Sequence, residues 1–353
     1  MQSVPFNDFY EIRTMSTIQH ALIACALFLT AGTALAGGHT PGSLLLFPEF
    51  DNRTANVTLV TVTNTNGSVA NGTVEVEFVY IGKYDHTGAE LPCLEFNRTH
   101  VLTPNDTLTV VTSAHNPQQQ QGYLYVFAKD RVTHQPIVYN HLIGNVVTMQ
   151  GIESVDFSMN PVSFAGIGDG VITDVDGDGN RDLDGTEYEG VPEEVYIPRF
   201  IGWNERLYRS ELILVALSGG TAFTTIAGMW IYNDNEEAFS AQHSFRCWTR
   251  KSLRSLNGVF SQSFLASTNH AANEVLGYPS VETGWIRVYG QTAFSTAEQI
   301  NDPALYAVLI EIVSGHGAAD LPFESVELQA NGALLPNSPF GDGDPVPVVG
   351  DNK

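Results

Sequence analysis

The feature that most constrains the fold is a period-two alternation of apolar and polar side chains that recurs along the chain. Residues 74–80 show it most clearly, as Val-Glu-Val-Glu-Phe-Val-Tyr, and residues 57–63 show it for part of their length. This period is typical of a strand with one buried face. Asn-Gly, Gly-Gly and Pro-Asn steps separate such runs, as turns do, whereas long amphipathic helical patterns are hard to find. Further strands are expected at residues 107–111, 123–127, 211–215, 285–289 and 305–310. The sequence therefore predicts an all-β protein built from antiparallel sandwiches.

Three motifs recur in the same order in the two halves of the chain. Pro-Glu-Phe at residues 48–50 matches Pro-Arg-Phe at 198–200, and Cys93 matches Cys247. The pattern Pro-x-x-Tyr-x-x-Leu-Ile then occurs at residues 136–143 and 303–310. The offset between partners grows along the chain, as loop insertions would make it grow. These matches predict an internal duplication.

The duplication predicts two tandem Ig-like antiparallel β-sandwich domains joined by an acidic calcium-type loop. The expected boundaries are residues 37–162 for the first domain, 163–193 for the acidic linker and 194–335 for the second, with a disordered tail at 336–353. Equivalent positions in two domains usually lie far apart. The match between Cys93 and Cys247 therefore favours two buried thiols over a disulfide, unless the domains pack about a two-fold axis.

The N-terminal region has the layout of an export signal. An apolar run at residues 21–29 is followed by Ala34-Leu-Ala36, which is typical of a cleavable secretory signal. We expect residues 1–36 to be removed, with Met15 as an alternative start of translation. A competing interpretation takes Leu22-Ile-Ala-Cys25 as a lipoprotein box with Cys25 lipidated, but few residues separate Met15 from that box. The expected location is secreted, either extracellular or at the cell surface, with no membrane span.

The charge balance narrows the range of partners. The chain has 16 basic and 39 acidic residues and a formal net charge of −23. Nucleic-acid binding needs clustered Lys and Arg, so this class is excluded. An anionic membrane surface is disfavoured for the same reason. The balance fits an acidic extracellular protein that attracts cations.

The strongest chemical motif is an acidic loop at the junction of the halves. Asp174, Asp176 and Asp178 occupy positions 1, 3 and 5 of a loop that has Gly179 at position 6. Ca²⁺ prefers six to eight oxygen ligands, and such spacing supplies them from one turn of chain. The loop resembles the Asp-x-Asp-x-Asp-Gly loops of EF-hands and, more closely, those of dockerins and thrombospondin type 3 repeats. The expected Ca²⁺ ligands are Asp174, Asp176, Asp178, the backbone carbonyl of Asn180, Asp182, and Asp184 or Glu187.

The loop departs from the EF-hand pattern at position 12, where Gly185 replaces the bidentate glutamate. Arg181 also stands where an EF-hand has an apolar residue, and no flanking helices are apparent. We therefore expect a stand-alone calcium loop that stiffens the junction between the domains. The alternative is a flexible acidic linker.

No familiar catalytic motif occurs in the sequence. There is no His-Glu-x-x-His, no Gly-x-Ser-x-Gly, no P-loop and no dinucleotide fingerprint. The paired carboxylates Glu193–Glu194 and Glu236–Glu237 could serve a glycosidase, but acidic residues are common here. We expect a non-catalytic protein, with a secreted hydrolase of unfamiliar type as an alternative.

Two binding functions follow from the remaining features. A structural or adhesive protein could form filaments with other copies of itself if the apolar residues 43–47 completed a neighbour's sheet, although they could equally be the first strand of their own domain. A carbohydrate-binding protein could bind surface glycans through tryptophans of the second half: Trp203, Trp230, Trp248 and Trp285. The basic cluster at residues 246–254 is interpreted as a solvated loop, with docking of an acidic partner or of the acidic linker as the alternative. The Phe-Pro-Glu-Phe-Asp-Asn segment at residues 47–52 is similar to secreted bacterial proteins of uncharacterised function, which implies location only.

Overall fold

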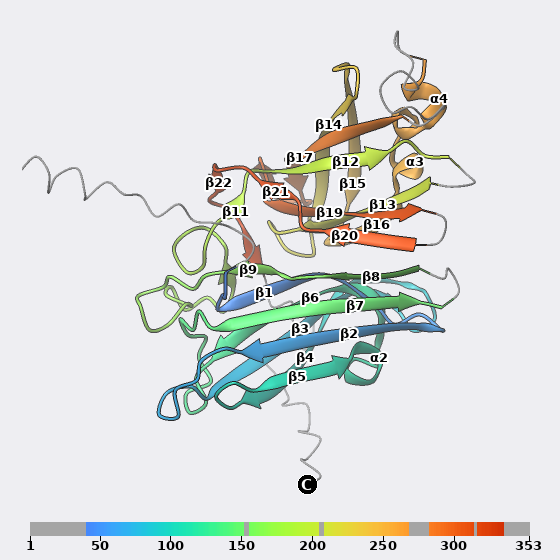
Figure 1. Cartoon of the computed structure of the whole chain (residues 1–353). Helices are drawn as coiled ribbons and strands as arrows, with labels where there is room; N and C mark the ends of the chain where they lie inside the picture. Colours follow the sequence, from blue (N-terminus) through green and yellow to red (C-terminus); the bar gives the residue numbers. More distant parts are fainter. Residues whose placement is uncertain (1–39, 152–154, 205–207, 268–281, 314–315, 335–353) are drawn as a thin grey trace, which may run out of the picture. The chain divides into compact units, whose positions relative to one another are not determined.

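A computed structural model describes residues 40–151, 155–204, 208–267, 282–313 and 316–334. The predicted signal sequence, Cys25 and the predicted tail at 336–353 lie outside these residues. The described residues belong to one compact unit, Gly37–Lys353. They are mostly β-strand with only short helices, so the predicted all-β class is confirmed (Figure 1).

The first half consists of two antiparallel sheets around a shared core. A five-stranded sheet has the order β4-β3-β6-β1-β9, and a four-stranded sheet has the order β5-β2-β7-β8. Val60 and Val62 of the smaller sheet and Phe47 of the larger one are fully buried. The strands are β1 (Leu44–Asp51), β2 (Asn56–Asn64), β3 (Val74–Asp85), β4 (Glu90–Leu102), β5 (Thr107–Val111), β6 (Gln119–Lys129), β7 (Leu142–Gln150), β8 (Val155–Met159) and β9 (Val162–Phe164), with the short helix α2 (Thr112–His115) after β5.

The second half repeats this arrangement strand for strand. Its larger sheet has the order β15-β14-β17-β12-β21, with β18 added beside β17, and its smaller sheet has the order β16-β13-β19-β20. The strands are β12 (Glu194–Ile201), β13 (Tyr208–Ala216), β14 (Thr224–Asn233), β15 (Ala238–Phe245), β16 (Trp248–Ser252), β17 (Thr283–Phe294), β18 (Gln299–Asn301), β19 (Leu305–Val313), β20 (His316–Asp320) and β21 (Phe323–Glu324). Three short helices, α3 (Leu253–Leu256), η1 (Gly258–Phe260) and α4 (Gln262–Leu265), follow β16.

An equivalent bulge identifies the first sequence match as a true one. The register of β1 against β6 shifts between Phe47 and Phe50, and that of β12 against β17 shifts between Ile197 and Phe200. A glycine faces each phenylalanine: Gly122 faces Phe50, and Gly284 faces Phe200. A Cβ at either glycine would lie about 2 Å from a carbonyl oxygen of the neighbouring strand, so no larger residue fits beside the bulge.

The second sequence match, between Cys93 and Cys247, is wrong, and the expectation that these cysteines lie far apart fails with it. Cys93 lies near the start of β4, whereas Cys247 follows the end of β15, which is the counterpart of β4. The two residues are therefore not equivalent, and the argument that they lie far apart fails. They form a disulfide with a Cα–Cα distance of 6.4 Å, so the expectation of two buried thiols is also wrong.

The third match is out of register. Leu142 begins β7 and pairs with Asn64 at the end of β2, while Leu305 begins β19 and pairs with Ala216 at the end of β13. Leu142 therefore corresponds to Leu305, whereas the sequence pattern had matched it with Leu309. More residues separate Pro136 from the start of β7 than separate Pro303 from the start of β19. A sequence match that aligns the two prolines therefore misaligns the two strands.

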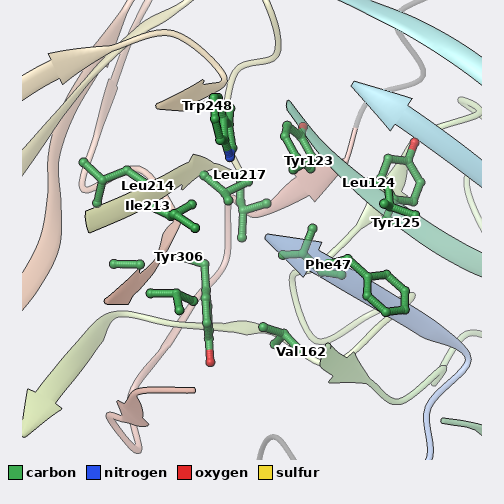
Figure 2. Packing of buried hydrophobic residues seen from close by; sticks show 14 of the residues in the cluster. Phe47, Tyr123, Leu124, Tyr125, Val162, Ile213, Leu214, Leu217, Trp248 and Tyr306 are labelled. Carbon is green, nitrogen blue, oxygen red and sulfur yellow. The ribbon is translucent and has the colours of Figure 1, made fainter. Parts of the chain in front are cut away.

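The two halves also make direct contact. The indole nitrogen of Trp248 donates to the carbonyl oxygen of Pro48 at 2.7 Å, and Arg250 pairs with Glu49 at 2.8 Å. Figure 2 shows Phe47 and Leu124 of the first half in one buried cluster with Leu214 and Trp248 of the second. Strands β8 and β20 lie side by side at this junction (Figure 1).

The structure also bears on the basic cluster at residues 246–254 and on the apolar residues 43–47. Arg250, a member of the basic cluster, has a side chain only 6% exposed and also pairs with Glu211, so this part of the cluster is not a solvated loop. Residues 44–47, the major part of the proposed donor strand, lie in β1 between β6 and β9 of their own sheet. In the described part of the chain, no helix has the length and apolarity needed to cross a membrane.

Candidate metal centre

The acidic segment between the halves is tied to the rest of the chain by short strands. Strand β10 (Arg181–Asp182) pairs with β23 (Ala333–Leu334), and β11 (Val191–Pro192) pairs with β22 (Leu328–Gln329). The amide of Glu189 also donates to the carbonyl oxygen of Ala165 at 2.8 Å. The segment is therefore anchored to the C-terminal part of the chain as well as to the end of the first half.

The loop turns sharply at its glycines. Gly177, Gly179 and Gly185 have φ angles of +75°, +83° and +85°, a region that favours glycine. The aspartates between them bond to backbone amides two residues further on: Asp176 accepts from Asp178 N at 3.1 Å, and Asp178 accepts from Asn180 N at 2.7 Å. The alternation of Asp and Gly therefore serves to form the turns of the loop, in addition to placing oxygen atoms that could bind a cation.

Five of the predicted carboxylates come together in two overlapping groups. Asp176 belongs to both, and in each group the closest carboxylate oxygens lie within 4.8 Å of one another. The first group is Asp174, Asp176 and Glu187, and the second is Asp176, Asp178 and Asp182. Oxygens at this separation can coordinate one Ca²⁺ after small side-chain movements.

The other two predicted ligands have different surroundings. The side-chain amide of Asn180 donates to Asp178, and its backbone carbonyl stays a predicted ligand. Asp184 accepts from the amide of Thr186 at 2.7 Å and belongs to neither carboxylate group. Between the two residues that could replace the missing position 12 ligand, the geometry favours Glu187 over Asp184.

Glu187 closes the loop from the buried side. It is only 3% exposed, and its carboxylate accepts from Val175 N at 2.5 Å and from Asp182 N at 3.3 Å. These two bonds join the beginning of the loop to its end. The side chain of Glu187 therefore ties the two ends of the loop together.

The electrostatics of the cluster favour a cation. Burial raises the pKa of Asp182 to about 6, with Asp178, Asp184 and Asp176 adding to the shift. Burial also raises the pKa of Glu187. A carboxylate pKa rises when desolvation and like charges oppose ionisation, and the attraction of a bound divalent cation would offset both effects. The residues therefore fit a hard, oxygen-preferring ion.

Arg181 is the residue whose role the sequence did not reveal. Its guanidinium lies 4.8 Å from the ring centroid of Phe127 in β6 and donates to the carbonyl oxygen of Gly179 at 2.5 Å. It is 6% exposed, and its distance to Asp174 is 3.8 Å. It therefore fixes the acidic loop against the larger sheet of the first half. The only signal in the sequence was a lone arginine at an apolar position of the motif.

Comparisons with known proteins add nothing to this site: no protein-family model matches the chain, and no curated protein matches it. A functional conclusion must therefore rest on the chemistry of the residues themselves.

Proposed function

We propose that this is a secreted, non-catalytic structural or adhesive protein of the extracellular space or cell surface, stabilised by Ca²⁺ bound in the loop 174–187. The observation that carries the proposal is that four carboxylates gather around the carboxylate of Asp176, and that one of them belongs to the buried Glu187. Calcium in the millimolar range outside cells suits the weaker affinity of an extracellular loop.

The connections of the loop support a mechanical role. On one side, Arg181 packs on Phe127 of the first half. On the other, β10 and β11 pair with strands of the segment 328–334, and Ala333 N donates to Leu217 O of the second half at 2.6 Å. An ion that stiffens the loop would therefore stabilise contacts made with both halves.

The disulfide supports an oxidising location. Disulfides persist in secreted proteins and are rare in reducing compartments. The bond between Cys93 and Cys247 links the two halves directly. Together with the ion pair between Glu49 and Arg250, it favours a rigid body over two independently moving modules.

Calcium binding is tested by calorimetric titration and thermal unfolding of the mature chain. With a dissociation constant near 1 mM, 10 mM Ca²⁺ should stabilise the protein by about 1.4 kcal/mol. Asp176→Asn should abolish this effect because the residue is shared by both carboxylate groups. Glu298→Gln removes an exposed carboxylate elsewhere and serves as the matched control. A melting temperature that ignores Ca²⁺, or rises equally in Asp176→Asn, would contradict the proposal.

The proposal that copies of the protein assemble into filaments is tested separately, by electron microscopy and light scattering with and without Ca²⁺. We expect calcium-dependent assemblies if copies associate through exposed edges. Monomers under every condition would exclude filaments and leave a calcium-stabilised monomer.

A further inference from the structure

The outer face of the larger sheet in the second half carries a group of aromatic side chains. In one row of the register, Trp230 faces Arg287, Arg287 faces Tyr196, and Tyr196 faces Phe323. In the next row, Tyr232 of β14 faces Trp285 of β17. We call this surface the aromatic face and define it by the rings of Tyr196, Trp230, Tyr232, Trp285, Tyr289 and Phe323.

These rings are not needed for the core. The residues between them, Met229 and Ile231 of β14 and Ile286 and Val288 of β17, point inward and are at most 1% exposed. Trp230, Trp285 and Phe323 are instead 41%, 37% and 67% exposed. Large exposed aromatic side chains gathered on one surface mark binding sites more often than chance.

The four tryptophans of the second half therefore separate into two kinds. Trp248 is 2% exposed and bonded to Pro48, so it is a core residue. Trp203 lies beneath the guanidinium of Arg254, 4.0 Å from it. Trp230 and Trp285 remain as candidates for contact with a ligand.

Polar groups lie among the rings, and their charges are already paired. Arg287 donates to Glu194, and the hydroxyl of Tyr196 donates to the same carboxylate at 3.2 Å. Tyr232 and Trp285 stack with their ring centroids 4.5 Å apart. The face thus alternates apolar ring surface with hydrogen-bonding groups and carries little net charge of its own.

The combination of exposed rings and paired charges favours one class of ligand for the aromatic face over others. A wholly apolar partner would desolvate the pair formed by Arg287 and Glu194 without replacing its hydrogen bonds. An anionic polymer or an anionic membrane would be repelled by a chain of net charge −23. A sugar ring offers an apolar C–H face for stacking on Trp or Tyr and a rim of neutral hydroxyl groups for hydrogen bonds.

We propose that the aromatic face binds a neutral polysaccharide chain. The row from Trp230 to Phe323 crosses four neighbouring strands, about 14 Å at a strand spacing of about 4.8 Å, which accommodates several consecutive sugar rings. Because exposed rings lie in a row across the sheet, the face suits an extended chain instead of a single sugar. This binding is independent of Ca²⁺ at the acidic loop.

The test measures retention of the mature protein on microcrystalline cellulose, chitin and insoluble xylan. The double variant Trp230→Ala/Trp285→Ala should bind about tenfold more weakly than the wild type, because aromatic anchors dominate such interfaces. Phe264→Ala removes a ring that is also 39% exposed but lies on α4, and it should bind like the wild type. A cooperative thermal unfolding transition of all three proteins, recorded without Ca²⁺, verifies that they are folded.

Several outcomes would overturn the proposal. The proposal is wrong if the wild type is retained on none of the three polysaccharides. It is also wrong if the double variant binds as well as the wild type. A dimer in multi-angle light scattering that the double variant converts to a monomer would assign the face to a second copy. Co-sedimentation with phosphatidylcholine vesicles that the double variant loses would assign it to a membrane.

Discussion

The outer faces of the two larger sheets occupy the same place in the same strand order, yet one is covered and the other is open. In the first half, Val79, Tyr125 and Phe127 face outward and are at most 6% exposed. The register places Trp230, Arg287 and Tyr289 at the corresponding positions of the second half, where they are partly or largely exposed. Arg181 of the acidic segment packs on Phe127 of the first face, whereas Trp230 of the second face is 41% exposed.

The bulge residues make a second such comparison. Glu49 and Arg199 both follow the proline of the bulge, but Glu49 is 1% exposed and pairs with Arg250 of the other half. Arg199 has a side chain 65% exposed and pairs with Glu311 at the surface. Both comparisons teach that the duplicated backbone tolerates opposite side-chain chemistry, because burial is decided by what packs against each copy.

The largest expected difference concerns equivalent aromatic rings on the two faces. Phe127→Ala should lower the free energy of unfolding by about 4 kcal/mol, because it leaves a cavity beneath Arg181. Tyr289→Ala, at the corresponding register position, should cost about 1 kcal/mol because that ring is partly solvated. Urea unfolding of both variants measures the two values. Equal losses would show that the second face is covered too.

The bulge residues should differ by somewhat less. Glu49→Ala should cost about 3 kcal/mol, because it leaves Arg250 buried with Glu211 as its remaining acidic partner. Arg199→Ala should cost less than about 1 kcal/mol, since the side chain of Arg199 is 65% exposed and solvent screens its ion pair with Glu311. Chemical denaturation at constant ionic strength compares them. A cost for Arg199→Ala that matched Glu49→Ala would remove the distinction between the two bulges.

The smallest expected effect is the pH dependence of stability that arises from Asp182 in the acidic loop. The folded-state pKa of Asp182, about 6, lies above the unfolded value of about 3.9. The stability from this group is therefore complete below pH 4 and is lost as the pH rises through 6. Without Ca²⁺, the melting temperature should fall by about 1–3 °C between pH 5 and pH 7 through this group.

Added Ca²⁺ should reverse this trend, since the ion binds the ionised carboxylates. Asp182→Asn should remove the contribution, and scanning calorimetry in chelator and in Ca²⁺ measures both. A wild-type profile that Asp182→Asn leaves unchanged would show that the cluster does not titrate in this way.

Local pattern was sufficient for part of the candidate site and not for the rest. The spacing of Asp174, Asp176 and Asp178 is a property of one short loop, so the sequence could single out these carboxylates, and Asp176 lies in one group with Asp174 and in another with Asp178. Their role as Ca²⁺ ligands stays a prediction. Glu187 remained one of two options because its selection depends on burial and on bonds to Val175 and Asp182. The contact of Arg181 with Phe127 joins distant parts of the chain and left no periodic signal.

By itself, the sequence determined the all-β class, paired the two Pro-x-Phe segments and singled out the Asp-x-Asp-x-Asp-Gly loop as a candidate site, because strand period, turn residues and ligand spacing are encoded over a few neighbouring residues. The tertiary structure decided the disulfide between Cys93 and Cys247, the burial of Glu49 and the exposure of Trp230. Each of these depends on which surfaces of the two halves meet. Two copies of one strand order meet different neighbours, so residues of similar local pattern become core in one half and surface in the other.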